Sequence, residues 1–330
     1  MSKLRKFRNS PERFFADSKH PALRTIGRVV APPLMRSARA LALLEDPAQA
    51  LVTRSIPIAS AAARRIAARA HAARQERIRR AGDPLVSVIM PARNAANDIE
   101  RALGSLLAQS HRALEVIVVD DASGDATSEI ANRIAERDAR VRVFRSEVAG
   151  GAAQARNRGL FESRGDYLTF QDADDESHPE RIERQLAVSL ERDAAVVVVN
   201  SIREMPDGRR AVINGRRFTK NVISMLLPRR PVFERVGYMR PLEVGEDSEY
   251  YERIKAVFGE GREVHLFQTL YRARFAEGSL LFSHGETRLS PTGDVEYIQA
   301  DAVKLALDAA LAELDAVRDG TKSPFVPYRP

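Results

Sequence analysis

Three aspartates crowd into four positions directly after a short apolar run. Residues 167–170 are followed within two positions by Asp172, and Asp174 and Asp175 come next. Like charges at this spacing repel one another, so they are stable together only in water or around a cation. Oxygen ligands of this kind suit Mg²⁺ or Mn²⁺ rather than zinc or copper. The alternative is an ordinary solvated turn before a helix, because aspartate favours turns and Pro179 suits a first helical turn.

Two other apolar runs, residues 86–91 and 116–119, also end in polar side chains. The side chains that follow them are Arg93, Asn94, Asp120 and Asp121. Continuous apolar runs of this length are typical of strands that are buried in a parallel sheet. If all three runs are parallel strands, their carboxyl ends lie at one edge, where ligands bind in such sheets. The coincidence therefore favours a binding site over three unrelated turns.

The elements that position these side chains alternate between strand and helix across residues 84–175. This alternation predicts an α/β fold of the Rossmann type, with a mostly parallel sheet and helices on both faces. No Gly-x-Gly-x-x-Gly pattern follows the first strand, and the sequence has no Walker-type Gly-Lys-Ser/Thr. These two absences argue against a dinucleotide-dependent oxidoreductase and a P-loop NTPase.

Four blocks resemble, in this order and at this spacing, the successive motifs of the family 2 glycosyltransferases. The blocks are residues 86–94, 118–125, 155–159 and 172–175, and the similarity covers residues 84–285. Enzymes of this family have the GT-A fold and use nucleotide-sugar donors with a divalent metal. The resemblance therefore implies a GT-A-like domain, a nucleotide-sugar donor such as a UDP-sugar, and Mn²⁺ or Mg²⁺ as cofactor.

The resemblance also assigns the donor to particular residues of this sequence. The implied donor-binding residues are Pro91, Arg93, Asn94, Asp120, Asp121, Arg156 and Asp172. Among them, Asp121 would accept a hydrogen bond from the uracil or its equivalent, and Asp172 would hold the ribose hydroxyls. Arg156 would approach the base or the diphosphate, although a salt bridge on a helix is the alternative. Arg93 departs from the family, which often has an aromatic residue there.

The metal and the general base are assigned by the same resemblance. In the Asp-x-Asp pattern, Asp174 would bind the metal that bridges the diphosphate, with Asp172 beside it. Glu246 and Asp247 follow Gly245 at the expected start of a helix, where acids are favoured by the helix dipole in any case. In the family this acidic block supplies the general base, for which we favour Asp247 and keep Glu246 as the alternative.

A late block, residues 270–280, also resembles the family, but the usual histidine is missing. Arg274 or Phe275 takes its place, and His284 follows too far along the chain. A third metal ligand from this region is therefore not expected. Arg272 or Arg274 would contact the diphosphate or form a surface ion pair.

The positive charge of the chain lies in its first residues. Residues 1–80 hold 18 Lys and Arg and 5 Asp and Glu, a net charge of +13, whereas the remaining 250 residues carry −6. We expect residues 1–83 to be a basic helical arm, either solvated and packed on the main domain or attached to an anionic membrane surface. Nucleic-acid binding is the third alternative, and it would be limited to unspecific phosphate attraction.

The same patterns predict how the rest of the chain is divided into domains. We expect a glycosyltransferase domain over residues 84–290, with a nucleotide-sugar half at 84–175 and an acceptor half at 176–290, and a C-terminal helix and extended tail at 291–330. The sequence lacks cysteine, an apolar run of membrane-spanning length and a secretory signal. These features indicate a cytoplasmic protein, which the arm would hold on the inner face of a membrane.

The expected activity is metal-dependent, inverting transfer of a sugar to a polysaccharide or glycolipid. A non-catalytic GT-A-like scaffold at a membrane surface is the rival from another class, but it would have no need of Asp172, Asp174 and Asp247. A nucleotidyltransferase is the second rival. It usually requires a Gly-rich loop after the first strand, and residues 92–96 contain no glycine.

Overall fold

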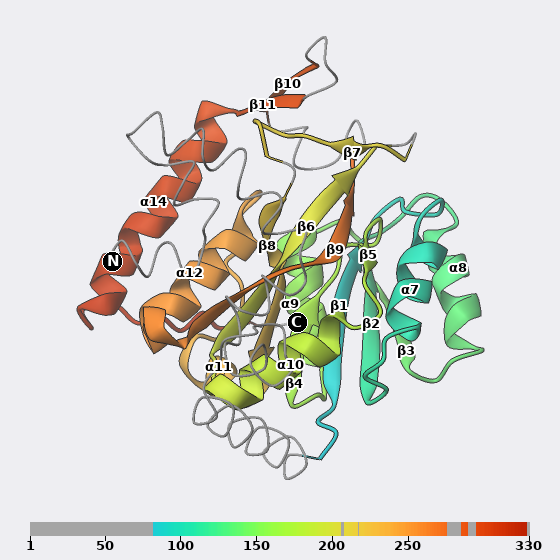
Figure 1. Cartoon of the computed structure of the whole chain (residues 1–330), viewed down its shortest axis with the longest axis horizontal. Helices are drawn as coiled ribbons and strands as arrows, with labels where there is room; N and C mark the ends of the chain where they lie inside the picture. The colour runs from blue at the N-terminus through green and yellow to red at the C-terminus, as the bar shows by residue number, and fades with distance from the viewer. Residues whose placement is uncertain (1–81, 206–207, 217, 276–284, 290–294, 329–330) are drawn as a thin grey trace, which may run out of the picture. The chain divides into compact units, whose positions relative to one another are not determined.

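The computed structural model describes residues 82–205, 208–216, 218–275, 285–289 and 295–328 (Figure 1). Residues 83–263 and 269–330 form one compact unit. The expected basic arm, apart from its last two residues, lies outside the described residues, as does His284. The expected domain boundaries therefore stay a prediction.

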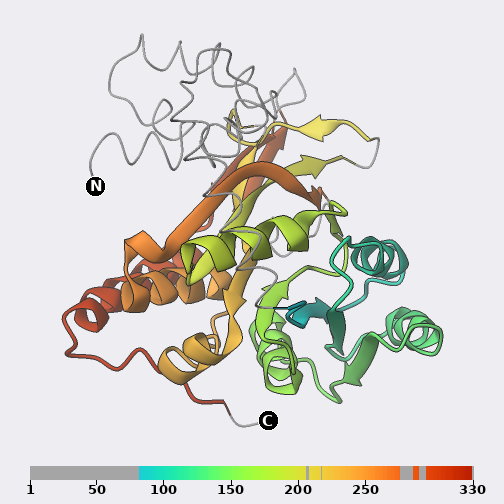
Figure 2. The same cartoon turned by 60° about the horizontal axis from the view of Figure 1, so that its bottom comes forward.

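The first half of this unit alternates between strands and helices as the sequence predicts. Its strands are β1 (Val86–Ala92), β2 (Leu114–Asp120), β3 (Val141–Arg145) and β4 (Tyr167–Phe170). Its helices are α7 (Ile99–Leu107), α8 (Thr127–Ala135) and α9 (Ala152–Glu162). Strand β1 pairs in parallel with β2 and β4, and β2 pairs in parallel with β3. Figure 2 shows α7 and α8 on one face of these strands and α9 on the other.

The second half extends this sheet with antiparallel strands. Its elements are β5 (Glu176–Ser177), α10 (Arg181–Arg192), β6 (Val196–Glu204), β7 (Arg210–Ala211), β8 (Thr219–Pro228), α11 (Arg229–Arg235), α12 (Glu246–Phe258), η1 (Glu260–Arg262), β9 (Glu263–Arg274), β10 (Gly285–Leu289), β11 (Val295–Gln299) and α14 (Asp301–Arg318). The strand order is β3-β2-β1-β4-β8-β6-β9-β5, with β7 paired to β6. Strand β8 runs antiparallel to both β4 and β6.

The C-terminal region differs in part from the helix and extended tail that the sequence predicts for residues 291–330. Residues 295–299 instead form β11, which pairs antiparallel with β10, and helix α14 begins only at Asp301. The physical reason is the composition of the segment, because Val295, Tyr297 and Ile298 favour strands and Val295 is buried. Beyond α14, Val326 forms a parallel bridge with Gly237.

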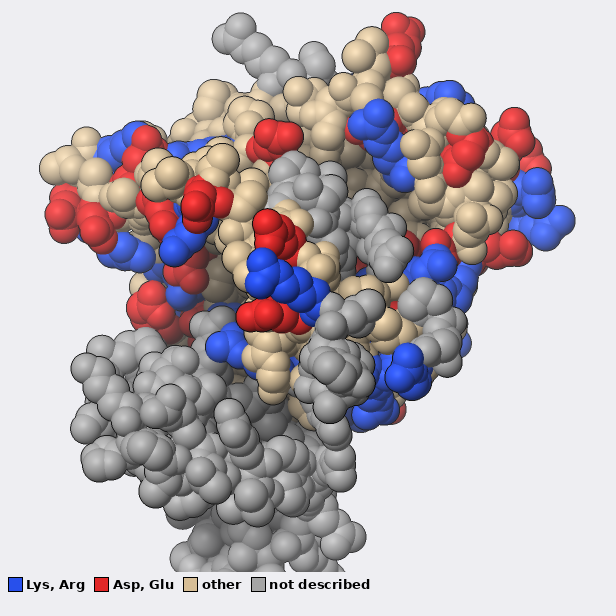
Figure 3. All heavy atoms as spheres, turned by 90° about the horizontal axis from the view of Figure 1, so that it is seen from above, with Lys and Arg blue, Asp and Glu red and all other residues tan. Residues whose placement is uncertain are grey.

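Acidic and basic side chains are interspersed on the face of the described residues that Figure 3 shows. Mixed charges of this kind are usual on the surface of a soluble domain. Among the helices that the structure describes, none is both long enough and apolar enough to cross a bilayer.

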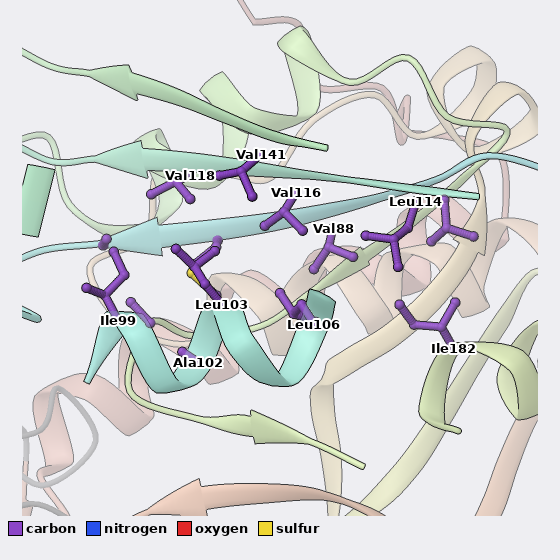
Figure 4. Close-up of a cluster of buried hydrophobic side chains, with 14 of the residues drawn as sticks. Val88, Ile99, Ala102, Leu103, Leu106, Leu114, Val116, Val118, Val141 and Ile182 are labelled. Carbon is purple, nitrogen blue, oxygen red and sulfur yellow. The ribbon is translucent and has the colours of Figure 1, made fainter. Parts of the chain in front are cut away.

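The core that supports the parallel strands lies on both of their faces. On one face, Val86, Val88 and Met90 of β1 belong to a fully buried cluster with Leu103 and Leu106 of α7 (Figure 4). On the other face, α9 approaches β1 so closely that a Cβ at Gly159 would lie 2.5 Å from Ile89 Cγ2. Each fully buried aliphatic side chain contributes about 1.5–3 kcal/mol. This two-sided burial fixes the strand ends on which the candidate site is built.

Candidate active site

The carboxyl ends of three parallel strands meet at one edge of the sheet. The register places Ala92 of β1 opposite Asp120 of β2, and Ile89 of β1 opposite Phe170 of β4. The backbone continues this alignment beyond the strands, because Asp121 N–H donates to the carbonyl of Ala92 at 2.8 Å. The polar residues that follow β1, β2 and β4 therefore share this edge, as the sequence predicts.

The loops after β1 and β2 are bonded to each other through Asn94. Its backbone N–H donates to Ser123 Oγ at 3.0 Å, and its Oδ1 accepts from Gly124 N–H at 2.9 Å. Asn94 and Ala122 both have positive φ angles, 51° and 54°, which for residues other than glycine are uncommon. Asn94 thus shapes the edge of the site through its side-chain oxygen.

Pro91 and Arg93 have simpler surroundings. Pro91 lies inside β1, opposite Val119, rather than at the end of the strand. Arg93 is exposed and forms no ion pair with any residue that the structure describes. Its guanidinium is therefore available to an anionic ligand.

Asp121 holds the start of helix α9. Its two carboxylate oxygens accept from the backbone N–H groups of Gly150 and Gly151, at 2.7 and 2.9 Å. Gly151 has a φ of 83°, which glycine adopts without strain. Each carboxylate oxygen keeps a second lone pair for a further donor.

Asp120 is fully buried behind this loop. Its Oδ1 accepts from Ser123 N–H at 3.1 Å, and its Oδ2 lies 3.6 Å from Arg145 Nε. Oδ2 has no hydrogen-bond partner within the described part of the chain. Asp120 Oδ2 is therefore a buried oxygen in an ion pair with the half-exposed Arg145, without a hydrogen bond.

The three aspartates after β4 form a tight anionic turn. Burial and the charge of Asp172 raise the pKa of Asp174 to about 6, and burial and the charges of Asp174 and Asp172 raise the pKa of Asp175 well above its ordinary value. Asp175 Oδ1 accepts from Arg274 N–H at 2.8 Å. A bound cation would relieve the repulsion between these crowded carboxylates.

The donor chemistry of this turn fits a hard divalent cation. Across the described ranges, no three His, Cys, Asp or Glu side chains converge as a complete metal cage. Mg²⁺ needs no such cage, since it usually takes one or two carboxylates together with water and substrate phosphates. Asp172 and Asp174 supply such a pair, and Asp172 uses only Oδ1 in its ion pair with Arg156.

Arg156 joins the two acidic parts of the site. From helix α9 its Nη2 bonds Asp172 Oδ1 at 2.7 Å, and its Nη1 bonds Oε1 of Glu246 at the start of α12. Burial alone would lower the pKa of this guanidinium, but the charges of Asp172, Glu246 and Asp247 outweigh it and raise the pKa. The structure thus shows Arg156 in ion pairs that join α9 to the aspartate turn and to α12, and its expected approach to the base or the diphosphate stays a prediction.

Glu246 and Asp247 have different surroundings although they are adjacent. Glu246 is buried and paired with Arg156, whereas Asp247 Oδ1 accepts only from the N–H and hydroxyl of Ser248, at 2.7 and 3.3 Å. Burial raises the pKa of both carboxyls, and Arg156 opposes the shift. Asp247 Oδ2 bonds to no group in the described segments, so Asp247 is the freer of the two carboxylates.

The arginines of the late block both lie in ion pairs. Arg272 Nε lies 3.0 Å from Glu204 Oε2, and Arg274 pairs with Asp98. Asp98 also accepts from Arg101 at 3.0 Å. This arrangement corresponds to the ion-pair alternative, and contact with a diphosphate would require the pairs to open.

Two side chains at the site have no role in the sequence prediction. Gln171 is fully buried and donates to the carbonyl of Asp175 at 3.0 Å, and the hydroxyl of Tyr271 accepts from Asp172 N–H at 3.2 Å. A polar residue at the end of a buried strand was the only local signal for Gln171. Tyr271 is 99 residues away from Asp172 in sequence, so no local pattern could have linked them.

Comparison with known proteins identifies relatives of this part of the chain. Residues 87–244 match the family described as glycosyl transferase family 2. TuaG of Bacillus subtilis, which is named for teichuronic acid biosynthesis, is 43% identical over 112 residues, which are 34% of this chain and 44% of TuaG. AmsB of Erwinia amylovora, an amylovoran biosynthesis glycosyltransferase, is 34% identical over 129 residues, 37% of this chain and 42% of AmsB. The chain spans less than half the length of these curated relatives.

Among solved structures, TarS 1–349 of S. aureus in complex with UDP-GlcNAc is similar with a TM-score of 0.53 and 20% identity. The match covers 71% of this chain and 70% of that chain. The likeness is one of fold, and it confirms the GT-A-like architecture that the sequence predicts.

Proposed function

Because residues 87–244 match glycosyl transferase family 2, we propose that this chain transfers a sugar from a nucleotide-sugar donor to a glycan or glycolipid hydroxyl. The observation that carries the proposal is the convergence of acidic groups around Arg156. Asp172 follows β4 and Glu246 begins α12, yet one buried guanidinium bonds to both. A scaffold protein would gain nothing from this buried ionic cluster, whose desolvation is costly.

The donor would lie along the edge formed by β1, β2 and β4. Asp121 has lone pairs left for the base, and Asp172 has one oxygen left for the ribose. The exposed Arg93 and the backbone around Asn94 would border the nucleotide. A UDP-sugar is the first donor to test.

Asp174 and Asp172 would hold Mn²⁺ or Mg²⁺, whose charge would stabilise the leaving diphosphate as a Lewis acid. The contribution of the protein chain is to position these two carboxylates at the end of β4. Arg156 would keep Asp172 oriented, since it bonds Oδ1 at 2.7 Å.

Asp247 would act as general base in an inverting transfer. A base in this reaction takes the proton from the acceptor hydroxyl as the hydroxyl attacks the anomeric carbon. Asp247 suits this role better than Glu246 because Glu246 is committed to Arg156. Its raised pKa also brings Asp247 closer to the range in which a carboxylate accepts a proton effectively.

The acceptor would be a polysaccharide or glycolipid of a cell envelope. The names of TuaG and AmsB, which refer to teichuronic acid and amylovoran biosynthesis, support this class of acceptor. The basic residues 1–80 would hold the enzyme peripherally on an anionic inner membrane surface.

Thermal unfolding with a panel of nucleotide sugars, each with and without Mn²⁺, tests the donor and the metal together. A ligand that binds the native state at 100 times its Kd adds about 2.7 kcal/mol of stability. One donor should raise the unfolding temperature in a Mn²⁺-dependent manner, and that donor should then be used in a transfer assay. If no donor shifts the unfolding temperature, the non-catalytic scaffold is the better interpretation. A nucleotidyltransferase would instead release pyrophosphate from a nucleoside triphosphate.

A further inference from the structure

The turn Asp172–Asp175 is held at both ends by side chains that lie behind it. At its start, Asp172 N–H donates to the hydroxyl of Tyr271 at 3.2 Å. At its end, the carbonyl of Asp175 accepts from Gln171 Nε2 at 3.0 Å. Neither Gln171 nor Tyr271 belongs to the expected ligand-binding residues.

Gln171 is itself fixed by neighbouring elements. Its Nε2 also lies 3.1 Å from the carbonyl of Ala102 and 3.2 Å from Ser105 Oγ on helix α7, and its Oε1 accepts from the hydroxyl of Ser177. The side chain is fully buried, and turning the amide over would set Oε1 against these acceptors and leave polar groups unsatisfied at a cost of about 1–3 kcal/mol each. The amide therefore has one stable orientation.

Tyr271 is fixed from the other side by Arg181. The guanidinium lies 5.7 Å from the centre of the Tyr271 ring. It also donates to Ser177 Oγ at 2.7 Å and to Thr169 Oγ1 at 2.9 Å. Ser177 thus connects the Arg181–Tyr271 pair to Gln171.

Arg181 is unusual because it is fully buried and forms no ion pair with the described residues. A buried guanidinium without a carboxylate is costly, and hydroxyl oxygens and an aromatic face compensate only in part. Tyr271, whose ring lies beside Arg181, is also bonded to the aspartate turn through Asp172 N–H. The network thus places a fixed cation behind the turn without occupying any of its carboxylates.

Two carboxylates of the turn bond to groups outside it, Asp172 to Arg156 and Asp175 to Arg274 N–H, and these bonds leave the charges of the three aspartates close together. Asp172, Asp174 and Asp175 repel one another, so the free turn would open unless other groups held its backbone. Groups behind a metal site that orient its ligands commonly change metal affinity by about 10–100-fold when they are removed. We propose that Gln171 and Tyr271 are positioning residues that hold the Asp172–Asp175 turn in its ligand-binding conformation, with Arg181 as their support.

This proposal deepens the proposed function. Its prediction for ligand affinity rests on the proposed function, whereas its prediction for amide exchange at Asp172 does not. Tyr271→Phe tests it in the full chain, because this change keeps the ring against Arg181 and removes only the hydroxyl. Tyr250→Phe is the matched control. Tyr250 is also fully buried, and its hydroxyl donates to the carbonyl of Gly237 at 2.9 Å rather than bonding to the aspartate turn.

Two measurements apply to both variants. Amide hydrogen exchange without ligand reports whether the Asp172 N–H is still held, and titration with Mn²⁺, alone and with UDP, reports ligand affinity. Tyr271→Phe should speed exchange at Asp172 and weaken Mn²⁺ binding by about 10-fold or more. Tyr250→Phe should change neither by more than about 2-fold, even if its thermal stability falls equally.

Gln171→Met tests the other end of the turn with Gln109→Met as control. Gln109 is a fully buried glutamine whose side chain bonds Ser105, His178 and Ile182 rather than the turn. The proposal is overturned if Tyr271→Phe and Gln171→Met bind Mn²⁺ with the affinity of their controls, or if exchange at Asp172 is unchanged in Tyr271→Phe. If the wild type binds neither Mn²⁺ nor UDP, the proposed function fails, and exchange at Asp172 alone decides whether Tyr271 holds the turn.

Discussion

Glu246 and Asp247 show how two adjacent carboxylates acquire different chemistry. Glu246 is bound to a buried guanidinium, and Asp247 has one oxygen without a partner in the described part of the molecule. Asp247→Asn should leave donor affinity unchanged and lower the rate of transfer by about 10²–10⁴-fold, because a general base contributes that much. Donor titration and single-turnover transfer measure the two quantities separately.

Glu246→Gln is the matched comparison for Asp247→Asn. This change removes one of the two carboxylates that bond to Arg156, so it should destabilise the fold by about 2–4 kcal/mol. Denaturant unfolding would detect the loss. Near wild-type transfer by Asp247→Asn, together with loss of transfer in a folded Glu246→Gln, would reverse the assignment of the base.

The aspartate turn makes the ligand-free protein sensitive to pH. Burial and the charge of Asp172 raise the folded-state pKa of Asp174 to about 6, from an ordinary value of 3.8. The folded state therefore binds this proton more tightly than the unfolded chain does, and this contribution to stability is present below about pH 4 and is lost as the pH rises through about 6. Because Asp174 and Asp175 are close together, their two carboxyls titrate as a pair.

Asp174→Asn should remove much of this pH dependence. Without ligand, the variant should be more stable than the wild type at about pH 7.5, by on the order of 2 kcal/mol, and the two should converge near pH 4. Urea unfolding at both pH values measures the difference. A constant difference between the two proteins across this range would show that Asp174 is not titrating as described.

At the scale of elements, the parallel half of the sheet could be predicted because buried parallel strands are continuous apolar runs. The edge where Asp121 and Asp172 lie follows from that half alone. The antiparallel strands and β11 could not be predicted as well, because their pairing depends on segments distant in sequence. For the same reason, the contact between Arg156 and Glu246 could not be predicted from the sequence, because 90 residues separate them.

Helix α12 carries the expected base, and Gly245 fixes the point where this helix begins. Gly245 has a φ of 85°, and a Cβ there would lie 3.2 Å from Leu307 Cδ1 of α14. Gly245→Ala should therefore destabilise the protein by about 1–2 kcal/mol and also slow transfer, because the start of α12 must move. Urea unfolding and single-turnover transfer are the two measurements.

Gly104→Ala is the control for this prediction and should change the stability of the protein in the opposite direction. Gly104 lies exposed inside α7 without a positive φ, and a Cβ added there would have no neighbour within 4 Å. Alanine favours a helix interior over glycine by up to about 1 kcal/mol, so this variant should be slightly more stable with unchanged transfer. Equal stability of Gly245→Ala and the wild type would mean that the left-handed turn before α12 is not required.

At the scale of the whole molecule, charge is distributed unevenly along the chain. Residues 1–80 carry +13, and the remaining 250 residues carry −6. The described face in Figure 3 accordingly shows interspersed charges rather than a basic patch. If this protein binds an anionic surface, the contact is therefore expected from residues 1–80.

Sedimentation with vesicles tests this expectation directly. Each basic residue close to an anionic bilayer contributes about 1 kcal/mol, so contact by about a third of the arm's basic residues would give useful affinity. The full chain should sediment with anionic vesicles at low salt, less at moderate salt because of screening, and not with neutral vesicles. Residues 81–330 should remain in the supernatant in all three conditions. If the full chain and residues 81–330 are recovered equally in the supernatant with anionic vesicles at low salt, the arm is a solvated segment, and the proposed transferase activity is unaffected.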